Sequence, residues 1–256
     1  MLFGREYMPE GAGVDPDAPR KKGAARLLEI LSRDLDGIFL SGTLAMLACA
    51  PAAILAGVAL WLGSLPLCLL AAVAAGWLVG PALTSLYDTI LRALRDEPGF
   101  WWHTYKRVWK QSFKSSLVPG IVFTLLWTLV AYAAFVLPQL TTVSAGFALV
   151  LVVDMVLLLT LGSYYWMQNA LFETSLSQKL SNCVRMFLGF LPRTALSAAF
   201  QLGYWLLMAA VIPRCAFIFL LTGLWVPNLL AALAVYAPME KCLHLEEQIR
   251  AKQETN

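Results

Sequence analysis

The feature that most constrains this chain is a run of 51 residues, 37–87, that contains no Asp, Glu, Lys or Arg. Further charge-free runs occupy residues 115–153, 155–172, 194–213 and 216–239. A helix that crosses a bilayer needs about 20 predominantly apolar residues. Only 14% of the chain is charged, whereas a soluble domain has roughly 25% charged residues. The sequence therefore predicts an integral membrane protein.

The apolar runs also predict the fold class. They lack the alternation of polar and apolar residues that marks barrel strands, and a helix satisfies its own backbone polar groups within one segment. We expect an all-α, polytopic membrane protein with six transmembrane helices and amphipathic cytoplasmic connecting helices. The predicted spans are about 38–62, 66–90, 117–137, 144–167, 194–212 and 216–237.

The sequence predicts one membrane domain between two polar tails. Residues 1–23 contain several prolines and glycines and are expected to form a disordered tail. Residues 24–245 would form the six-helix domain, and residues 246–256 a polar C-terminal tail. A cleaved signal peptide is not expected, because a long mixed polar stretch precedes the first apolar run.

Basic residues predict the orientation in the membrane. Of the 19 Lys and Arg residues, all except Arg214 fall in the N-terminal segment, the two long connections or the C-terminal segment. Six spans place these four segments on the same side, which the positive-inside rule assigns to the cytoplasm. Both termini are therefore expected to be cytoplasmic.

The stretch FWWHTYKRVWKQSFKSS, residues 100–116, interleaves aromatic and basic side chains. At about 100° per residue, the two sets occupy adjoining arcs of a helix. The pattern is typical of an in-plane helix whose aromatic face enters the headgroup region and whose basic face meets anionic lipid. The aromatic face could equally pack on the protein's own helices, and nucleic acid is not an expected partner at this tethered position. The residues concerned are Trp101, Trp102, Tyr105, Lys106, Arg107, Trp109, Lys110, Phe113 and Lys114.

The second long connection has a similar design. Ser175 and Gln178 have the spacing of a capping box, which predicts a helix that begins after Ser175. An apolar stripe follows at helical spacing. It consists of Leu176, Leu180, Cys183, Val184, Phe187 and Leu191.

Two segments carry a resemblance to a known family. GPALTSLYDTILRALRDEPGFWWHTYKRVWKQSFKSSL, residues 80–117, and KLSNCVRMFLGFLPRT, residues 179–194, resemble the YesL-like family of small bacterial integral membrane proteins, classed as a domain of unknown function. The chain differs from the family in an additional apolar stretch between Pro51 and Gly80, and in Ser112 where the family often has Asn. The matching motif residues include Gly80, Pro81, Leu86, Tyr87, Lys179, Asn182 and Pro192.

The resemblance implies a location and a context. It places the protein in the bacterial cytoplasmic membrane, and such proteins often occur beside sugar-uptake and polysaccharide-degradation systems. It implies no catalytic residue, cofactor or ligand.

Asp154 is the one formally charged side chain deep within a predicted span. A charged residue at the centre of a span costs roughly 2.5–3.5 kcal/mol on insertion scales, so such residues often mark ion or proton pathways. Alternatively, Asp154 could join helices through hydrogen bonds to Gln201, Asn228 or a Trp indole. Pro227, next to Asn228, could kink the last span or help to form a binding site.

Motifs for catalysis are not found in the sequence. There is no H-E-x-x-H, no G-x-S-x-G and no Walker A loop, so an enzyme, a cofactor and a metal site are not expected. The leading hypothesis is an accessory or interaction component associated with carbohydrate uptake, with transporter subunits as partners. The alternative is a small-solute or proton-coupled transporter that uses Asp154.

Overall fold

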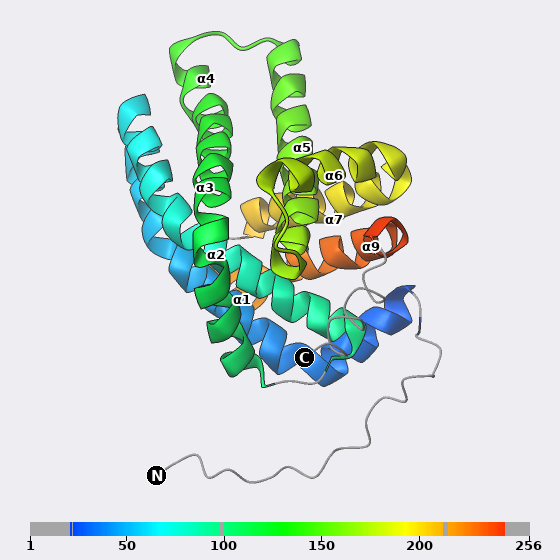
Figure 1. Cartoon of the computed structure of the whole chain (residues 1–256). Helices are drawn as coiled ribbons and strands as arrows, with labels where there is room; N and C mark the ends of the chain where they lie inside the picture. Colours follow the sequence, from blue (N-terminus) through cyan, green and yellow to red (C-terminus); the bar gives the residue numbers. More distant parts are fainter. Residues whose placement is uncertain (1–20, 22, 98–99, 212–214, 244–256) are drawn as a thin grey trace, which may run out of the picture.

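The computed structural model describes residues 21, 23–97, 100–211 and 215–243. All regular structure in these residues is helical, which confirms the all-α prediction. The helices are α1 Gly23–Trp61, α2 Leu65–Arg95, α3 Trp101–Phe135, α4 Leu137–Leu140, α5 Ala145–Leu171, α6 Leu176–Gly189, α7 Leu191–Val211, α8 Ala216–Thr222 and α9 Trp225–Leu243 (Figure 1). The predicted tails lie almost wholly outside the described residues.

Five helical segments of the described chain are long and apolar enough to cross a membrane. They are α1, α2, the α3–α4 segment Trp101–Leu140, α5 and α7. The chain is therefore a multi-pass helical membrane protein. Six continuous spans are not found in the described residues, because the sixth predicted span divides into α8 and α9 at Gly223, whose φ is 44°. A positive φ ends a helix, and glycine adopts it without a steric penalty.

The segment 100–116 differs from the prediction of a separate in-plane helix. It forms the first half of α3, which continues through Pro119 into the third span. Proline removes one backbone hydrogen bond and usually kinks or ends a helix. Here Ser116 and Gly120, on either side of Pro119, are buried against α2, so tertiary packing keeps both halves in one helix.

Small residues bring α2 and α3 into backbone contact. Gly76 and Gly80 lie one turn apart on α2, opposite Ser116 and Gly120 on α3. A Cβ atom on Gly76 would overlap the backbone of Ile121, and one on Gly80 would overlap the Ser116 carbonyl. Helices in membranes associate through such small-xxx-small patterns, because lipid supplies no hydrophobic drive between them.

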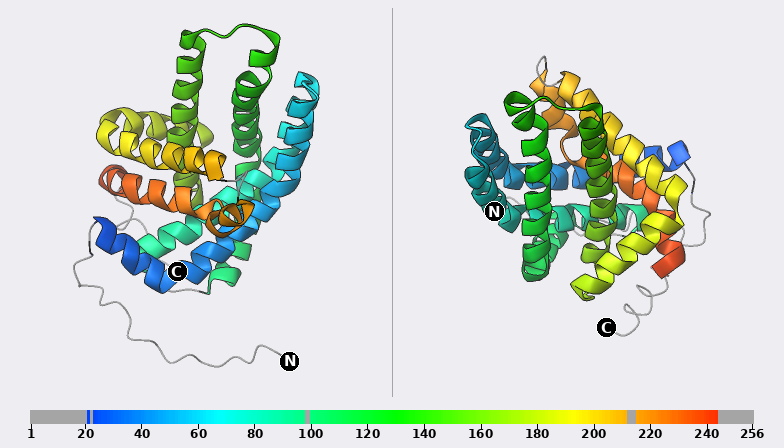
Figure 2. Two further views of the ribbon diagram at one scale, coloured as in Figure 1. Left: turned by 180° about the vertical axis from the view of Figure 1, so that it is seen from behind. Right: turned by 90° about the horizontal axis from the view of Figure 1, so that it is seen from above.

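The helices form two groups around α3 and α5 (Figures 1 and 2). α3 and α5 stand side by side, and α4 lies in the connection between them. α1 and α2 pack along each other and against α3, whereas α6, α7 and α9 lie crosswise on the other side. This arrangement surrounds the second half of α2 with other helices, and every residue from Gly80 to Asp88 is buried.

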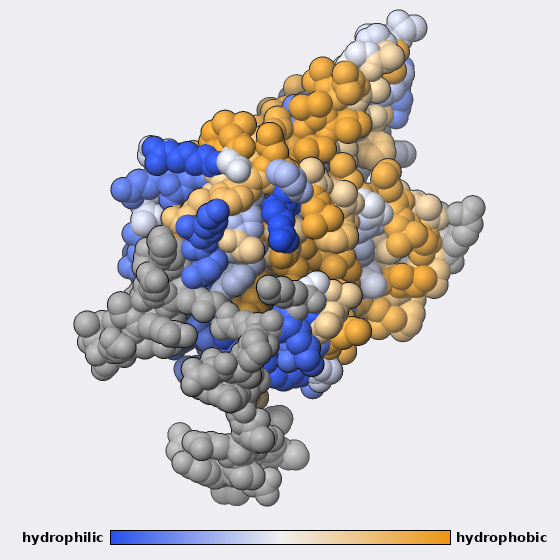
Figure 3. Space-filling view, turned by 90° about the vertical axis from the view of Figure 1, so that its right-hand side faces the viewer, coloured by the Kyte–Doolittle hydropathy of each residue, from blue (hydrophilic) through white to orange (hydrophobic). Residues whose placement is uncertain are grey.

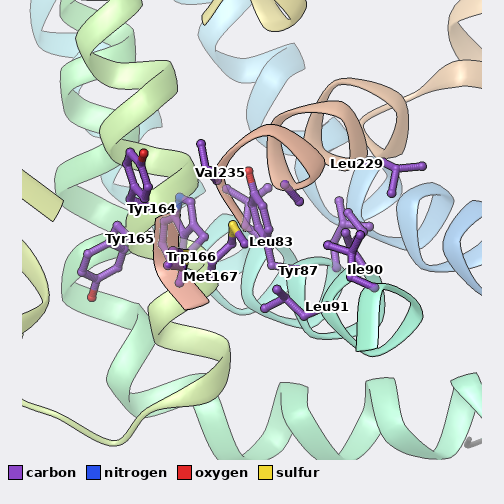
Figure 4. Packing of buried hydrophobic residues seen from close by; sticks show 14 of the residues in the cluster. Leu83, Tyr87, Ile90, Leu91, Tyr164, Tyr165, Trp166, Met167, Leu229 and Val235 are labelled. Carbon is purple, nitrogen blue, oxygen red and sulfur yellow. The ribbon is translucent and has the colours of Figure 1, made fainter. Parts of the chain in front are cut away.

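The core forms where α2, α5 and α9 meet. Tyr87 of α2, Trp166 and Met167 of α5 and Val235 of α9 are almost inaccessible to solvent and belong to one cluster (Figure 4). Aromatic rings pack edge to face in this region, with Phe123 and Trp166 at 5.6 Å between centroids. Such pairs contribute about 0.5–1.5 kcal/mol beyond their buried area.

An ion-pair cluster joins the first turns of α1 to the end of α2. Arg26 donates to the Leu94 carbonyl and to Asp96, both at 2.8 Å, and Arg33 also pairs with Asp96. Burial by itself would raise the pKa of Asp96, but the two guanidinium groups outweigh it and lower that pKa.

Figure 3 shows hydrophilic residues gathered at one end of the molecule and a hydrophobic surface over most of the rest.

The glycine contact generates a stability prediction. Gly76→Ala should destabilise the protein by about 1–3 kcal/mol, because backbone atoms of α3 cannot rotate away from a new Cβ. The thermal unfolding midpoint in a mild detergent measures the effect. Gly57→Ala is the matched control, since a Cβ at Gly57 of α1 meets no atom within 4 Å. Equal midpoints for the two variants would contradict the proposed role of the contact.

Candidate functional site

A cavity of about 440 Å³ lies between helices from both groups. Its lining is mostly apolar and aromatic, and α2, α3, α5, α7 and α9 all contribute to it. The lining residues are Cys49, Val79, Leu83, Tyr87, Phe123, Trp127, Met155, Leu159, Gly162, Ser163, Trp166, Gln201, Trp205, Leu224, Pro227 and Asn228.

Hydrogen bonds join the polar residues of the cavity wall. The Tyr87 hydroxyl donates to Asn228 Oδ1 at 2.8 Å and lies 3.2 Å from Ser163 Oγ. Gln201 Nε2 donates to Ser163 Oγ at 3.1 Å. The amide of Asn228 also donates to the Leu224 carbonyl at 2.7 Å, at the break between α8 and α9. This network links α2, α5, α7 and α9 along one side of the cavity.

Trp166, which lines the cavity, has a buried indole N–H. Its ring is 2% exposed, and its indole Nε1 is buried without a hydrogen-bond partner in the described part of the chain. A buried polar group normally has a partner, and leaving one unpaired costs about 1–3 kcal/mol.

The volume and lining of the cavity suit a small molecule, but its side chains include few groups that could take part in a reaction. Its volume is within the range of small-molecule sites, and a mostly apolar wall with a few polar groups is typical of them. No Asp, Glu, Lys, Arg or His is among its lining residues in the described chain. The site therefore suits a mostly apolar molecule that carries a hydroxyl or carbonyl oxygen.

The structure separates Asp154 from the other two intramembrane candidates. Gln201 and Asn228 line the cavity, whereas Asp154 does not. Asp154 is half-buried, lies next to exposed Val152 and Val153, and makes no hydrogen bond or ion pair with the described residues. The amides of Gln201 and Asn228 donate to Ser163 and Leu224, so neither forms a hydrogen bond to Asp154 in the described structure.

Some residues of the expected in-plane helix are buried against the protein, and others are exposed at its surface. Tyr105 is buried, and Trp101, Trp109 and Phe113 are half-buried. Trp102 is 45% exposed. The four basic side chains are exposed; they are Lys106, Arg107, Lys110 and Lys114. Much of the aromatic face thus packs on the protein itself.

The residues of the family resemblance lie at several places. Gly80 forms the α2–α3 contact, Pro81 and Leu86 are buried, and Tyr87 lines the cavity. Lys179 of α6 is 3% exposed. Asn182 is half-buried, and Pro192 is exposed in the first turn of α7, where proline is tolerated.

The α6 helix begins where the prediction places it, and the structure adds which of its faces is buried. The capping box of Ser175 and Gln178 is confirmed. Within α6, however, the buried face holds Lys179, Cys183 and Met186, and the predicted apolar stripe is largely exposed. Four apolar residues on that exposed face are Leu176, Leu180, Val184 and Leu188.

Several site residues were not identified from the sequence. Ser163 and Trp166 complete the cavity wall, and Thr84, Ser116 and Asn169 form a second buried polar group with Lys179. The available signal was the presence of Ser163, Gln168 and Asn169 in the last three turns of a mostly apolar span. Polar residues in such a span usually face the protein interior.

The comparisons with known proteins give a family match for part of the chain. Residues 38–133 match a family described as "Protein of unknown function, DUF624". The match includes the segment 80–117 and ends before the segment 179–194. No curated protein and no solved structure matches the chain.

The cavity generates a binding prediction. Octan-1-ol, which combines an apolar chain with a hydroxyl group, should raise the thermal unfolding midpoint of the parent protein, because binding stabilises the folded state. Leu159→Trp should remove this response by filling the cavity. Leu206→Trp, at a position on α7 that is 71% exposed, is the control for effects of the alcohol on detergent. An equal response in all three proteins would contradict binding in the cavity.

Proposed function

We propose that the protein is a non-enzymatic accessory component of a membrane complex associated with carbohydrate uptake. The observation that carries the proposal is the position of Asp154, the tenth of 27 residues in α5. A carboxylate within a span is costly unless it is paired. Because the described chain supplies no pair, a donor or cation from a transporter subunit would stabilise Asp154 at the protein surface.

The surroundings of Asp154 support a contact between proteins. Val150, one turn earlier on α5, is 56% exposed, and Val153 is 47% exposed. This face is therefore open to the bilayer or to another helix. Polar side chains that bond between membrane helices contribute about 0.6–2 kcal/mol each, and apolar packing around them adds to that contribution. The link to carbohydrate uptake rests on the resemblance of residues 80–117 and 179–194 to the YesL-like family.

The alternative of proton-coupled transport receives less support. A coupling carboxylate would have to face a cavity or pathway. Asp154 is absent from the lining of the cavity between the two helix groups, although Gln201 and Asn228 are present there.

The proposed location is the bacterial cytoplasmic membrane, with both termini in the cytoplasm. Both termini on one side require an even number of crossings, so α8 and α9, interrupted at Gly223, would have to supply the sixth although α9 lies crosswise to α3 and α5. The exposed basic residues of α3 would then meet the anionic headgroups of the cytoplasmic leaflet.

Photocrosslinking tests the partner contact. A photoreactive amino acid at Val150 in native membranes should capture a subunit of a transporter, identified by mass spectrometry. Asp154→Leu should abolish this product, whereas Asp154→Glu should retain it, because glutamate keeps the charge. The same reactive residue at Leu206 on α7 is the control for random collisions.

Two outcomes would overturn the accessory role. One is an unchanged crosslink in Asp154→Leu. The other is solute flux by the purified parent protein alone in vesicles that is lost in Asp154→Asn, which would establish the transporter alternative.

Cysteine labelling tests the orientation. In a parent without cysteines, a cysteine in place of Lys110 should react with an impermeant maleimide only after the cells are opened. A cysteine in place of Thr142, in the exposed connection before α5, should react in intact cells. The reverse pattern would contradict the positive-inside assignment.

A further inference from the structure

A second cavity, of about 500 Å³, lies between the first half of α3, the end of α5 and α6. Its wall differs from that of the cavity between the two helix groups, because most of the side chains in this second wall are polar or charged. They are Gln111, Ser112, Lys114, Ser115, Asn169, Glu173, Thr174 and Lys179. Val108, Ala170, Leu171 and Phe172 supply an apolar side.

Lys179 is the unusual residue of this cavity. Its side chain is 3% exposed, although lysine is almost never fully buried without a counter-charge. The Nζ atom donates to Asn169 Oδ1 at 2.7 Å. No carboxylate of the described residues lies within ion-pair distance of the Lys179 ammonium group. Glu173, which lines the same cavity, interacts with this group only through longer-range electrostatics.

The partners of Lys179 hold it in place without neutralising it. Asn169 Nδ2 donates to Thr84 Oγ1 and to Ser116 Oγ, both at 2.9 Å. Both amide protons of Asn169 are therefore used, and its oxygen is directed to Lys179. Three helices thus position one ammonium group, which has two further N–H donors available. Burial lowers the pKa of Lys179, so the ammonium form would gain from an added anion.

Ser112 adds a buried hydroxyl to the wall of the same cavity. It is 7% exposed, and its Oγ has no hydrogen-bond partner in the described part of the chain. Its carbonyl, by contrast, accepts a bond from Ser115. Ser112 and Lys179 both line the cavity, so a small side-chain rotation of Ser112 would let a bound group with several acceptor atoms bond to both residues.

We propose that this cavity binds a phosphate group, with Lys179 as the neutralising cation and Ser112 as a hydroxyl donor. Phosphate offers several acceptor oxygens, and bonds between charged groups are about twice as strong as neutral ones. Lys114 lines the cavity too and adds positive charge, whereas Glu173 opposes it. The proposal does not depend on the contact at Asp154.

A lipid headgroup is the source that the surroundings favour. The exposed apolar stripe of α6 runs along the same helix as Lys179 and would lie against acyl chains. The apolar side of the cavity suits the glycerol region of a lipid. Free phosphate shares the chemistry of the headgroup, so the experiment separates the two sources.

Titration of the purified full chain in a neutral detergent tests the proposal. Dioctanoyl phosphatidate should raise the thermal unfolding midpoint, and dioctanoylglycerol, which lacks the phosphate, should not. Lys179→Met should weaken the affinity for phosphatidate by about ten-fold or more, since it removes a charged hydrogen bond. Lys110→Met, an exposed position of α3 outside the cavity, should bind like the parent.

Two further variants keep the test decisive if Lys179→Met fails to fold. Glu173→Gln, at an exposed position, should tighten phosphatidate binding several-fold because it removes the opposing charge. Ser112→Ala should weaken it. Stabilisation by inorganic phosphate equal to that by phosphatidate would assign the site to free phosphate. An equal effect of dioctanoylglycerol, or unchanged affinity in Glu173→Gln and Ser112→Ala, would overturn the proposal.

Discussion

The close approach of α2 and α3 is the contact on which the rest of the structure depends. Gly76 and Gly80 allow the two backbones to touch, and Ser116 and Gly120 provide the matching surface. Because this contact holds both sides of Pro119 against α2, α3 stays one helix from Trp101 to Phe135. Dispersion and close packing must supply this association, since lipid is as apolar as the side chains.

Polar groups within the apolar interior follow one rule, which is that each needs a partner. Tyr87, Ser163, Gln201 and Asn228 satisfy one another along the intramembrane cavity. Asn169 does the same for Thr84, Ser116 and Lys179. Exceptions occur in both settings: the Trp166 indole and the Ser112 hydroxyl belong to residues that line a cavity, whereas the hydroxyls of Ser85 and Tyr105, also buried without partners in the described chain, line neither cavity. The size and lining of the two cavities, rather than unpaired groups by themselves, therefore mark the two proposed binding sites.

Packing also decides which charges serve structure and which remain available. Arg26 and Arg33 share Asp96 and also pair with Glu29 and Asp34, and the contacts to Asp96 join α1 to the end of α2. Asp154 and Lys179 have no such ion pair with the described residues, yet they differ in environment. Lys179 is enclosed and lines a polar cavity, whereas Asp154 is half-buried among exposed valines. The first position suits a small anionic group, and the second suits another membrane helix.

The sequence by itself determined the helical membrane class, the approximate positions of five crossing helices and the start of α6, because apolar length and a capping pair are local signals. It also identified Asp154, Gln201 and Asn228 as unusual residues. Only the tertiary structure decided that Gln201 and Asn228 share a cavity and that Asp154 lies outside it. The same holds for the continuity of α3 through Pro119, the break at Gly223 and the burial of Lys179, because each depends on contacts between residues far apart in the chain.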